Sequence, residues 1–406
     1  MFSKFIVLLF SSFLVLTSFC HCTSQQTKNS VAVKSKEVTT TLPIAMGAEQ
    51  INTYLHILEG KKIGLVVNNT SIVKGTHLLD TLLLSGVDVV KIFAPEHGFR
   101  GDTENGGHVN DQVDPATSLS IISLHGKNKK PTAEQIKGLD ILVFDMQDVG
   151  VRFYTYYCTM FYVMQAAAEN HVAVMILDRP NPNGHYIDGP ILDTVTCRSF
   201  VGLLPIPIVH GLTLGEMAQM INDEGWLGKN KTCPLKVIPM LNYTHLTSYS
   251  LPILPSPNLP NDQSIQLYPS VCLFEGTKFS LGRGTPFPFQ VVGYPDTIFG
   301  KFSFTPVSIP GKSNEPPLMN KKCYGIDLRT AQTNGFTLMY LLDMYRKDPN
   351  KATFFIPFFE KLIGNKTVRG MIERGDSEET IKASWQTELM AYKVMRKKYL
   401  LYTDFE

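Results

Sequence analysis

Residues 141–145 read Ile-Leu-Val-Phe-Asp, a run of four apolar residues that ends in a carboxylate. A short run of this kind is typical of a strand that is buried on both faces of a parallel sheet. Four other segments are also short and mainly apolar, and they span residues 63–67, 87–93, 119–124 and 172–177. Because helical patterns separate these segments, the sequence predicts an α/β fold whose larger domain has a Rossmann-like, mainly parallel sheet.

Each predicted strand leads into a polar side chain. In chain order these residues are Asn68, Glu96, His125, Asp145 and Asp178. In open parallel sheets, ligands bind outside the carboxyl ends of the strands. The sequence therefore places the candidate site at that edge of the sheet.

The composition is typical of a globular protein with two domains. The chain has 406 residues, 44% hydrophobic content and a formal net charge of +2, so it has no basic surface that would favour nucleic acid or an anionic membrane. Five prolines over residues 252–269 make a long regular helix there implausible and mark the predicted domain junction. We predict a Rossmann-like catalytic domain over 46–248 and a smaller α/β or α+β domain over 249–406, with the active site in the cleft between them. An apolar stripe predicts one long helix over 377–399.

The first 45 residues are predicted to form an export signal and a linker. A lysine precedes an apolar stretch that is too short to span a bilayer, so we interpret residues 1–22 as a signal peptide and 23–45 as a disordered linker. Cys20 or Cys22 is a candidate for lipid attachment, and simple cleavage is the alternative. We expect an exported protein that is either periplasmic or a membrane-anchored lipoprotein.

Motifs for metals and nucleotides are absent from the sequence. Five cysteines follow the signal region without the CxxC spacing of a zinc site. No GxGxxG follows the first predicted strand, and no GxxxxGK[ST], GxSxG or HExxH motif occurs. We therefore predict no metal, no cofactor, no nucleotide and no nucleic-acid partner. A Rossmann-type oxidoreductase or transferase is disfavoured for the same reason.

The segment over 93–101, Phe-Ala-Pro-Glu-His-Gly-Phe-Arg-Gly, leaves the second predicted strand through a proline and two glycines. Such a loop would present Glu96, His97 and Arg100 at the carboxyl edge of the sheet, where a carboxylate can act as a general acid. The alternative is an ion pair between Glu96 and Arg100 at a solvated turn. Other acids at the same edge favour a functional site.

A second polar cluster, over 144–156, gathers groups that hydrogen-bond sugar hydroxyls and stack on sugar rings. Its candidates are Asp145, Gln147, Asp148, Arg152, Tyr154 and Tyr156. An ion pair between Asp148 and Arg152 in a first helical turn is the structural alternative.

A third cluster follows the fifth predicted strand and holds Asp178, Arg179, Asn181 and Asn183. Its asparagines can equally serve a turn, whereas Arg179 suits an anionic substituent. The remaining candidates are His210, Ser256, Asn258, Glu275 and Arg283.

Taken together, these motifs resemble the exo-β-N-acetylmuramidases of bacteria, the NamZ-type glycoside hydrolases that were once a domain of unknown function. The motifs are APEHGFRG (94–101), FDMQDVGVRFYTY (144–156), DRPNPNG (178–184), PIPIVHGLTLGEMA (205–218), SPNLP (256–260), LFEGT (273–277) and GRGTPFPF (282–289). The resemblance implies a Rossmann-like domain and a smaller second domain around an active-site cleft. It also implies release of N-acetylmuramic acid from the non-reducing ends of peptidoglycan glycan chains without a cofactor, with Glu96 as the catalytic residue.

Glycoside hydrolysis typically needs a carboxylic acid that protonates the leaving oxygen and a second group that stabilises positive charge or activates water. We expect Glu96 to be the acid. For the second role the candidates are Asp145, Asp148 and Glu275, in that order, and the 2-acetamido group of the substrate is a further alternative.

The lactyl carboxylate of N-acetylmuramic acid calls for an arginine, because the planar guanidinium binds carboxylates in two places. We place Arg152 first and Arg179 second among the candidates, which also include Arg100 and Arg283. The rival function is that of a periplasmic sugar- or muropeptide-binding protein without turnover, which needs arginines and aromatic rings but no catalytic acid.

Overall fold

The computed structural model describes residues 42–95, Phe99 and residues 112–406. The predicted signal peptide with Cys20 and Cys22, most of the predicted linker, and Glu96, His97 and Arg100 lie outside the described residues. Within the described part of the chain, no helix is long and apolar enough to cross a membrane.

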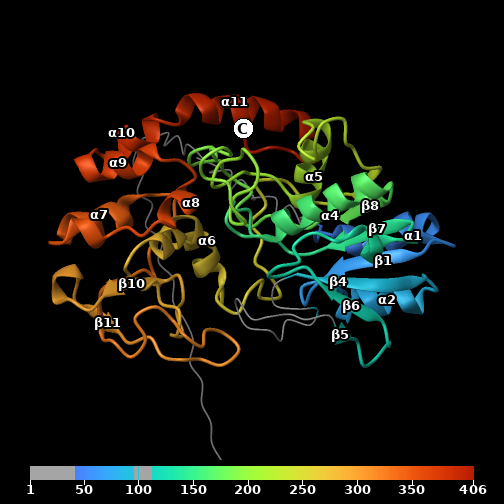
Figure 1. Ribbon diagram of the computed structural model, residues 1–406, viewed down its shortest axis with the longest axis horizontal. Helices are drawn as coiled ribbons and strands as arrows, with labels where there is room; N and C mark the ends of the chain where they lie inside the picture. Colours follow the sequence, from blue (N-terminus) through green and yellow to red (C-terminus); the bar gives the residue numbers. More distant parts are fainter. Residues whose placement is uncertain (1–41, 96–98, 100–111) are drawn as a thin grey trace, which may run out of the picture. The chain divides into compact units, whose positions relative to one another are not determined.

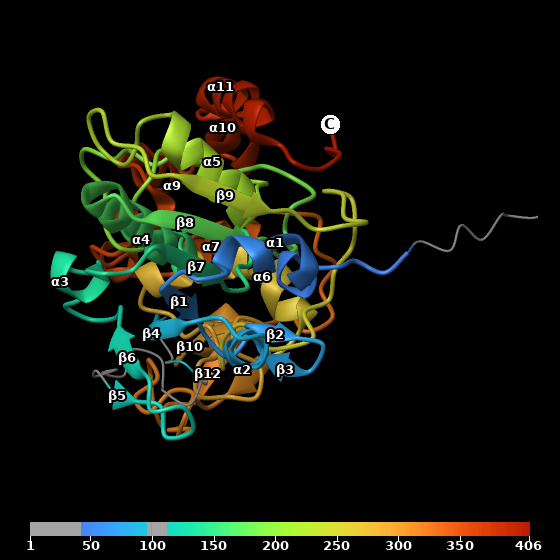
Figure 2. The same cartoon turned by 90° about the vertical axis from the view of Figure 1, so that its right-hand side faces the viewer.

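A seven-stranded sheet forms the first part of the structure (Figure 1). Its strands, in spatial order, are β5 (Gln112–Val113), β6 (Ser120–Ser123), β4 (Val89–Ala94), β1 (Ile63–Val67), β7 (Ile141–Asp145), β8 (Ala173–Leu177) and β9 (Leu235–Ile238). All neighbours pair in parallel except β5, which runs antiparallel to β6. In chain order the six parallel strands follow the 3-2-1-4-5-6 arrangement of the Rossmann fold, which confirms the predicted fold class. Figure 2 shows the strands in this order.

Alternate residues of the central strands enter two separate hydrophobic cores. Val66 and Phe144 pack into one core with α4 (Tyr156–Asn170) and α5 (Leu214–Asp223). Leu65 and Val143 pack into the other with α1 (Ile51–Leu58) and α2 (Leu78–Leu84). Because both faces of the sheet are covered, the strands are apolar throughout.

The five predicted strands are present, with ends that differ from the prediction by one or two residues. The sequence analysis missed the two edge strands, β5 and β9. The β5 strand has only two residues, and β9 contains an exposed lysine, Lys236, and is only half-buried. Edge strands lack the continuous apolar run that marks a central strand, so neither gave a signal.

The second part of the structure is α+β, as predicted. It begins with α6 (Asp262–Val271) and holds a three-stranded antiparallel sheet in the order β10 (Val291–Tyr294), β12 (Cys323–Asp327), β11 (Phe302–Phe304). Helices α7 (Met339–Lys347), α8 (Phe359–Ile363), α9 (Thr367–Arg374), α10 (Glu378–Ala383) and α11 (Gln386–Arg396) follow. The core on the α4 side of the large sheet continues into this part through Phe274 and Phe354.

Two local predictions are wrong. The expected long helix over 377–399 is broken between α10 and α11, where the buried indole of Trp385 donates its Nε1–H to Asp188 at 3.2 Å. The end of the predicted linker is also held in place, because Ala45 forms a two-way backbone bridge with Leu241. In both cases a contact with a distant segment decides the local structure.

Candidate active site

The carboxyl ends of β1 and β7 lie side by side at the point where the strand order reverses. In open α/β sheets, ligands bind at such a switch point. A cavity of about 300 Å³ opens there, and Thr70, Gln147, Arg179 and Pro252 contribute to its lining. Two sequence candidates, Gln147 and Arg179, therefore line a cavity at the predicted edge of the sheet.

The side chains of Asn68 and Gln147 hold the loops that surround this cavity. The Oδ1 atom of Asn68 accepts from the backbone N–H of Thr70 at 2.9 Å and from its hydroxyl at 2.6 Å. The Nε2 atom of Gln147 donates to the carbonyls of Asp148 and Pro180 at 2.8 and 2.6 Å. The buried Nδ2 of Asn68 has no partner among the described residues, so it is a donor that a water or ligand could satisfy.

Asp145 and Arg179 pair with each other, which corrects their predicted roles. The Asp145 side chain is fully buried and that of Arg179 is 5% exposed. Arg179 donates Nε to Oδ1 at 2.5 Å and Nη2 to Oδ2 at 2.9 Å. A carboxylate held by both nitrogens of a guanidinium is poorly placed to attack a sugar. The Arg179 guanidinium, in turn, already binds Asp145 and is not free to bind a substrate carboxylate. Asp145 loses its first rank as the second catalytic group, and Arg179 loses its rank as a lactyl ligand.

Asp178 also lies inside the protein and does not open onto a cleft. Its fully buried carboxylate accepts from the Thr213 hydroxyl at 2.7 Å, the Tyr402 hydroxyl at 2.6 Å and the Gly215 N–H at 2.8 Å. Burial raises the pKa of Asp178 to about 6 in spite of these donors. Asp178 therefore ties the C-terminal tail to the sheet, and these contacts favour a structural role over the predicted substrate contact.

Asn181, Asn183 and His210 are likewise structural. Asn181 donates to the carbonyl of Leu212 at 2.8 Å, and Asn183 donates to that of Val149 at 2.8 Å. His210 is 1% exposed, and burial lowers its pKa to about 3, so its ring is neutral. Within the described residues, these three side chains join loops at the sheet edge and are not among the residues that line the cavities of about 780, 300 and 160 Å³.

Arg152, the first choice for the lactyl carboxylate, is fully buried. Its Nη1 donates to the carbonyls of Pro190 and Ile206, both at 2.8 Å, and its Nη2 donates to those of Leu362 and Ile363 at 3.0 and 2.9 Å. Within the described residues it forms no ion pair with Asp148, because its guanidinium is bonded to these four carbonyls instead. These four carbonyl partners favour a structural cross-link over the predicted lactyl contact.

A second cavity, of about 160 Å³, lies where the two parts of the chain meet. Six sequence candidates line it: Tyr154, Tyr156, Ser256, Asn258, Glu275 and Arg283. The rings of Tyr154 and Tyr156 meet edge to face at 5.0 Å, and the Tyr154 hydroxyl donates to the carbonyl of Pro255 at 2.6 Å. These contacts fix an aromatic wall opposite polar groups, the arrangement that suits a sugar ring.

An ion pair forms the charged end of this cavity. Arg283 donates Nε and Nη2 to Oε1 of Glu275 at 2.9 and 2.7 Å, and its guanidinium lies 4.9 Å from the ring centre of Phe289. The Glu275 side chain is 26% exposed and that of Arg283 is 17% exposed. Both groups are therefore more accessible to a ligand than Asp145, which is fully buried.

Asp148 is buried, with 7% exposure. One carboxylate oxygen accepts from the Gly150 N–H at 2.7 Å, and the other has no partner among the described residues. Burial raises the pKa of Asp148 to about 7. A carboxylic acid with a pKa in this range can donate or accept a proton at neutral pH.

The comparisons with known proteins agree with these motifs. Family models for the N-terminal and C-terminal parts of the exo-β-N-acetylmuramidase NamZ match residues 63–263 and 266–402. The chain belongs to the NamZ family. The peptidoglycan β-N-acetylmuramidase NamZ of Bacillus subtilis (strain 168) is 37% identical over 93% of this chain and 94% of its own length.

Two solved structures of DUF1343 family proteins from Bacteroides fragilis NCTC 9343 share the fold of this NamZ family member. One is 50% identical with a TM-score of 0.83 and covers 89% of this chain and 100% of its own. The other is 28% identical with a TM-score of 0.77 and covers 89% and 99%.

The described residues on either side of Glu96 in this NamZ family member make their own contacts at the sheet edge. The loop leaves the sheet after Ala94, whose carbonyl accepts from the Leu124 N–H at 2.8 Å. Phe99 is buried, and its ring meets that of His77 edge to face at 4.7 Å. Ala94, at the carboxyl end of β4, and Phe99 are therefore each held by contacts with other described residues.

Sequence reasoning missed several residues that build the two cavities. Tyr268 and Phe289 line the cavity of about 160 Å³ that also holds Tyr154 and Tyr156. Thr70 lines the cavity of about 300 Å³ at the ends of β1 and β7. The aromatic content of the motif over 282–289 was a usable signal for Phe289. Tyr268 lies in a helix whose apolar spacing looks like ordinary core. Among the described residues, no group of three or more His, Cys, Asp or Glu side chains could hold a metal ion.

Proposed function

We propose that this protein is an exo-acting peptidoglycan glycoside hydrolase that releases N-acetylmuramic acid from the non-reducing ends of glycan chains or muropeptide-derived saccharides. Membership of the NamZ family supports this function. The observation that carries it is the cavity in which Tyr154 and Tyr156 face Glu275 and Arg283. Such a cavity offers an aromatic face, a carboxylate and a cation to one sugar.

In this proposal Glu96 protonates the leaving oxygen. The order of the candidates for the second role changes, because Asp145 is fully buried in its pair with Arg179, whereas Glu275 is 26% exposed in its pair with Arg283. Glu275 now comes first, since it is accessible in the cavity, and Asp148 comes second, since its raised pKa suits proton transfer. We assign the lactyl carboxylate to Arg283, the candidate arginine that shares a cavity with the tyrosines.

Turnover of a defined substrate tests the function. The purified protein should release N-acetylmuramic acid from a disaccharide in which that sugar is non-reducing, and it should cleave a chromogenic β-N-acetylmuramide. A matched chromogenic β-N-acetylglucosaminide, which lacks the lactyl group, is the control substrate and should be cleaved far more slowly. Binding of the disaccharide without any release would instead support a periplasmic binding protein.

We also propose export of the protein to the periplasm, with Cys20 or Cys22 as the residue for a lipid anchor. The apolar stretch over 5–16 and the polar segment that follows support this. Cell fractionation and incorporation of labelled fatty acid into the wild type, Cys20→Ala and Cys22→Ala would test it. Loss of label in one variant identifies the anchor, absence of label with periplasmic recovery indicates simple cleavage, and cytoplasmic recovery contradicts export.

A further inference from the structure

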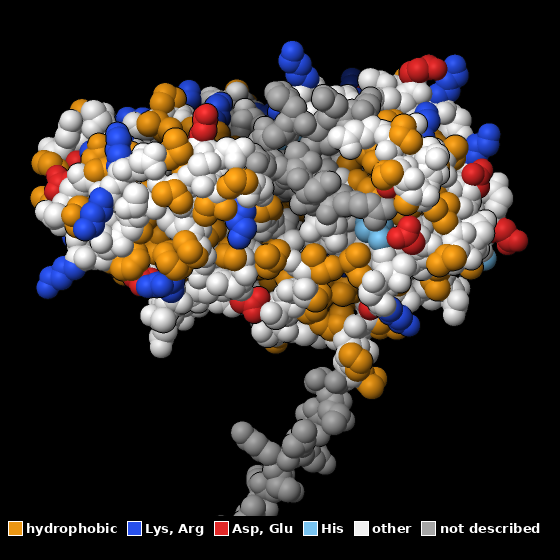
Figure 3. All heavy atoms as spheres, turned by 90° about the horizontal axis from the view of Figure 1, so that it is seen from below, with side chains coloured by type: hydrophobic (Ala, Val, Ile, Leu, Met, Phe, Trp, Pro, Cys, Tyr) orange, Lys and Arg blue, Asp and Glu red, His pale blue; other side chains and the backbone are white. Residues whose placement is uncertain are grey.

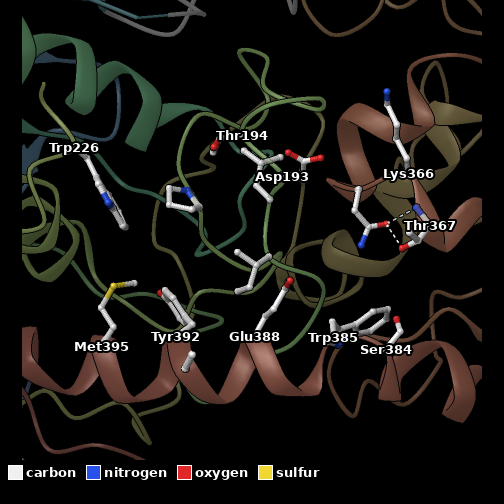
Figure 4. Close-up of a pocket in the computed structure, with 15 residues that line it drawn as sticks. Asp193, Thr194, Trp226, Lys366, Thr367, Ser384, Trp385, Glu388, Tyr392 and Met395 are labelled. Carbon is white, nitrogen blue, oxygen red and sulfur yellow. Dashed lines mark hydrogen bonds between the residues drawn. The ribbon is translucent and has the colours of Figure 1, made fainter.

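A further cavity lies away from the two cavities at the sheet edge and shares no residue with them. Its volume is about 780 Å³, within the range of roughly 300 to 1,000 Å³ that small-molecule sites occupy. Figure 4 shows its lining, which comes from α11, from the start of α9, from the segment over 191–194 and from Trp226.

The walls of this cavity are rigid. Arg152 cross-links two of them, because its guanidinium donates to the carbonyls of Pro190 and Ile206 on one side and of Leu362 and Ile363 on the other. The backbone N–H of Asp193 adds a bond to the carbonyl of Gly364 at 2.8 Å. The cavity is therefore formed before any ligand arrives, which lowers the entropic cost of binding.

The floor of the cavity is aromatic and apolar. Trp226 is partly exposed, and its Nε1–H has no partner among the described residues. Tyr392 and Met395 rise from α11 beside it (Figure 4). The Tyr392 hydroxyl is already used, because it donates to the carbonyl of His210 at 2.8 Å. Trp226 thus supplies both a flat surface and an unused donor.

The charges of the cavity disfavour an anionic ligand. The Glu388 side chain points from α11 into the cavity, whereas the ammonium group of Lys366 points away from Glu388 (Figure 4). Glu388 has no ion-pair or hydrogen-bond partner within the described residues. The Asp193 carboxylate accepts from the Val195 N–H at 2.9 Å and from Thr196, and Lys366 further favours its ionised form. The lining therefore carries two carboxylates, Asp193 and Glu388, against one ammonium group, and it offers an indole N–H as a donor.

We infer that this cavity is an accessory site for a neutral saccharide of the substrate, the N-acetylglucosamine units of the glycan, which it holds outside the catalytic cavities. Pyranose rings have apolar faces that pack on an indole and hydroxyls that donate to a carboxylate. N-acetylmuramic acid fits less well, because its own carboxylate would be repelled by Glu388. The inference rests on the proposed hydrolase function, since it takes the glycan substrate as its ligand.

Intrinsic fluorescence provides a direct test, because the chain has only two tryptophans. Trp385 is 2% exposed, so acrylamide quenching of the native protein reports mainly on Trp226. Tri-N-acetylchitotriose, a neutral probe without a lactyl group, should protect the emission from acrylamide. Protection should persist in Trp385→Phe. Unchanged quenching at saturating probe concentrations would overturn the inference.

Calorimetric titration with the same probe tests the residues. Trp226→Ala and Glu388→Gln should each weaken binding roughly two- to tenfold. Val394→Ala, on an exposed part of α11 with 67% exposure, is the matched control and should bind as the wild type does. Glu388→Gln preserves side-chain size, so it remains informative if Trp226→Ala does not fold. Equal affinity in the wild type, Trp226→Ala and Glu388→Gln would place the probe elsewhere and overturn the inference.

Activity separates this inference from the proposed function. Trp226→Ala should cleave the chromogenic β-N-acetylmuramide as the wild type does and should lose efficiency only on long glycan chains. If the wild type binds the probe at Trp226 but cleaves neither substrate, the saccharide site stands and the hydrolase function fails. If the wild type cleaves both and Trp226→Ala cleaves both equally well, the accessory role in catalysis fails and the hydrolase function stands.

Discussion

Arg179 forms a bidentate ion pair with Asp145 at the end of β7, with nitrogen–oxygen distances of 2.5 and 2.9 Å, and both side chains are buried. Removing one member of a buried pair leaves an uncompensated charge, which costs roughly 3 to 5 kcal/mol. We expect Arg179→Met to lower the free energy of unfolding by about this amount in urea titrations.

The double variant Asp145→Leu/Arg179→Met should be more stable than Arg179→Met alone, because it leaves no buried charge. Arg329→Met is the matched control, since its pair with Asp327 is 41% and 30% exposed and should contribute less than about 1 kcal/mol. A loss in Arg179→Met no larger than in Arg329→Met would contradict a structural role for the buried pair.

Glu96→Gln should abolish most turnover while it leaves folding intact, because the change is nearly isosteric and removes the transferable proton. General acid catalysis is worth roughly 10² to 10⁴ in rate. The measurement is kcat on the chromogenic β-N-acetylmuramide, with the thermal unfolding midpoint as a check on folding. The expected residual activity is well below a tenth of the wild-type kcat. Retention of more than about a tenth would exclude Glu96 as the acid.

Arg283→Met should impair selection for the lactyl group. A charge-assisted hydrogen bond is worth roughly 1.5 to 3 kcal/mol, so kcat/KM for the muramide should fall about ten- to a hundredfold. The glucosaminide has no carboxylate and should be affected far less. Arg152→Met is the control, because its buried guanidinium should affect stability and not the ratio of the two substrates. An unchanged ratio in Arg283→Met would mean that another group binds the lactyl carboxylate.

Asp148 should destabilise the protein as the pH rises. Its pKa is about 7 in the folded state because of burial, against roughly 3.9 in an unfolded chain. Below pH 4 both states are protonated and the penalty is absent. Between pH 4 and 7 the unfolded state loses its proton first, so folding is increasingly penalised, by roughly 4 kcal/mol at most.

Asp148→Asn should remove this pH-dependent penalty. The difference in unfolding free energy between Asp148→Asn and the wild type should therefore move in favour of the variant from pH 4 to pH 8. Urea titrations at both pH values measure it, and any constant cost of the new amide cancels in the comparison. A difference that is the same at pH 4 and pH 8 would show that Asp148 ionises normally in the folded protein.

The sequence by itself determined the sheet and the edge that carries the site. Runs such as 141–145 are apolar because the strand is covered on both faces, and this local requirement is visible without any partner. The same sequence could not say which polar residues face a ligand. Arg152 and Arg283 look alike in the sequence, yet Arg152 is fully buried among backbone carbonyls and Arg283 lines a cavity with 17% of its side chain exposed.

Only the tertiary structure decided these roles, because a polar side chain takes whichever partner the folded chain brings nearest. The carbonyls that satisfy Arg152 come from positions as far away as Ile363, and the hydroxyl that satisfies Asp178 comes from Tyr402. Such partners are more than 200 residues distant along the chain. Strand formation depends on neighbouring residues, so it can be predicted from a short stretch of sequence. Whether a polar residue becomes a buried cross-link or an accessible ligand group depends on desolvation and on contacts that exist only after folding.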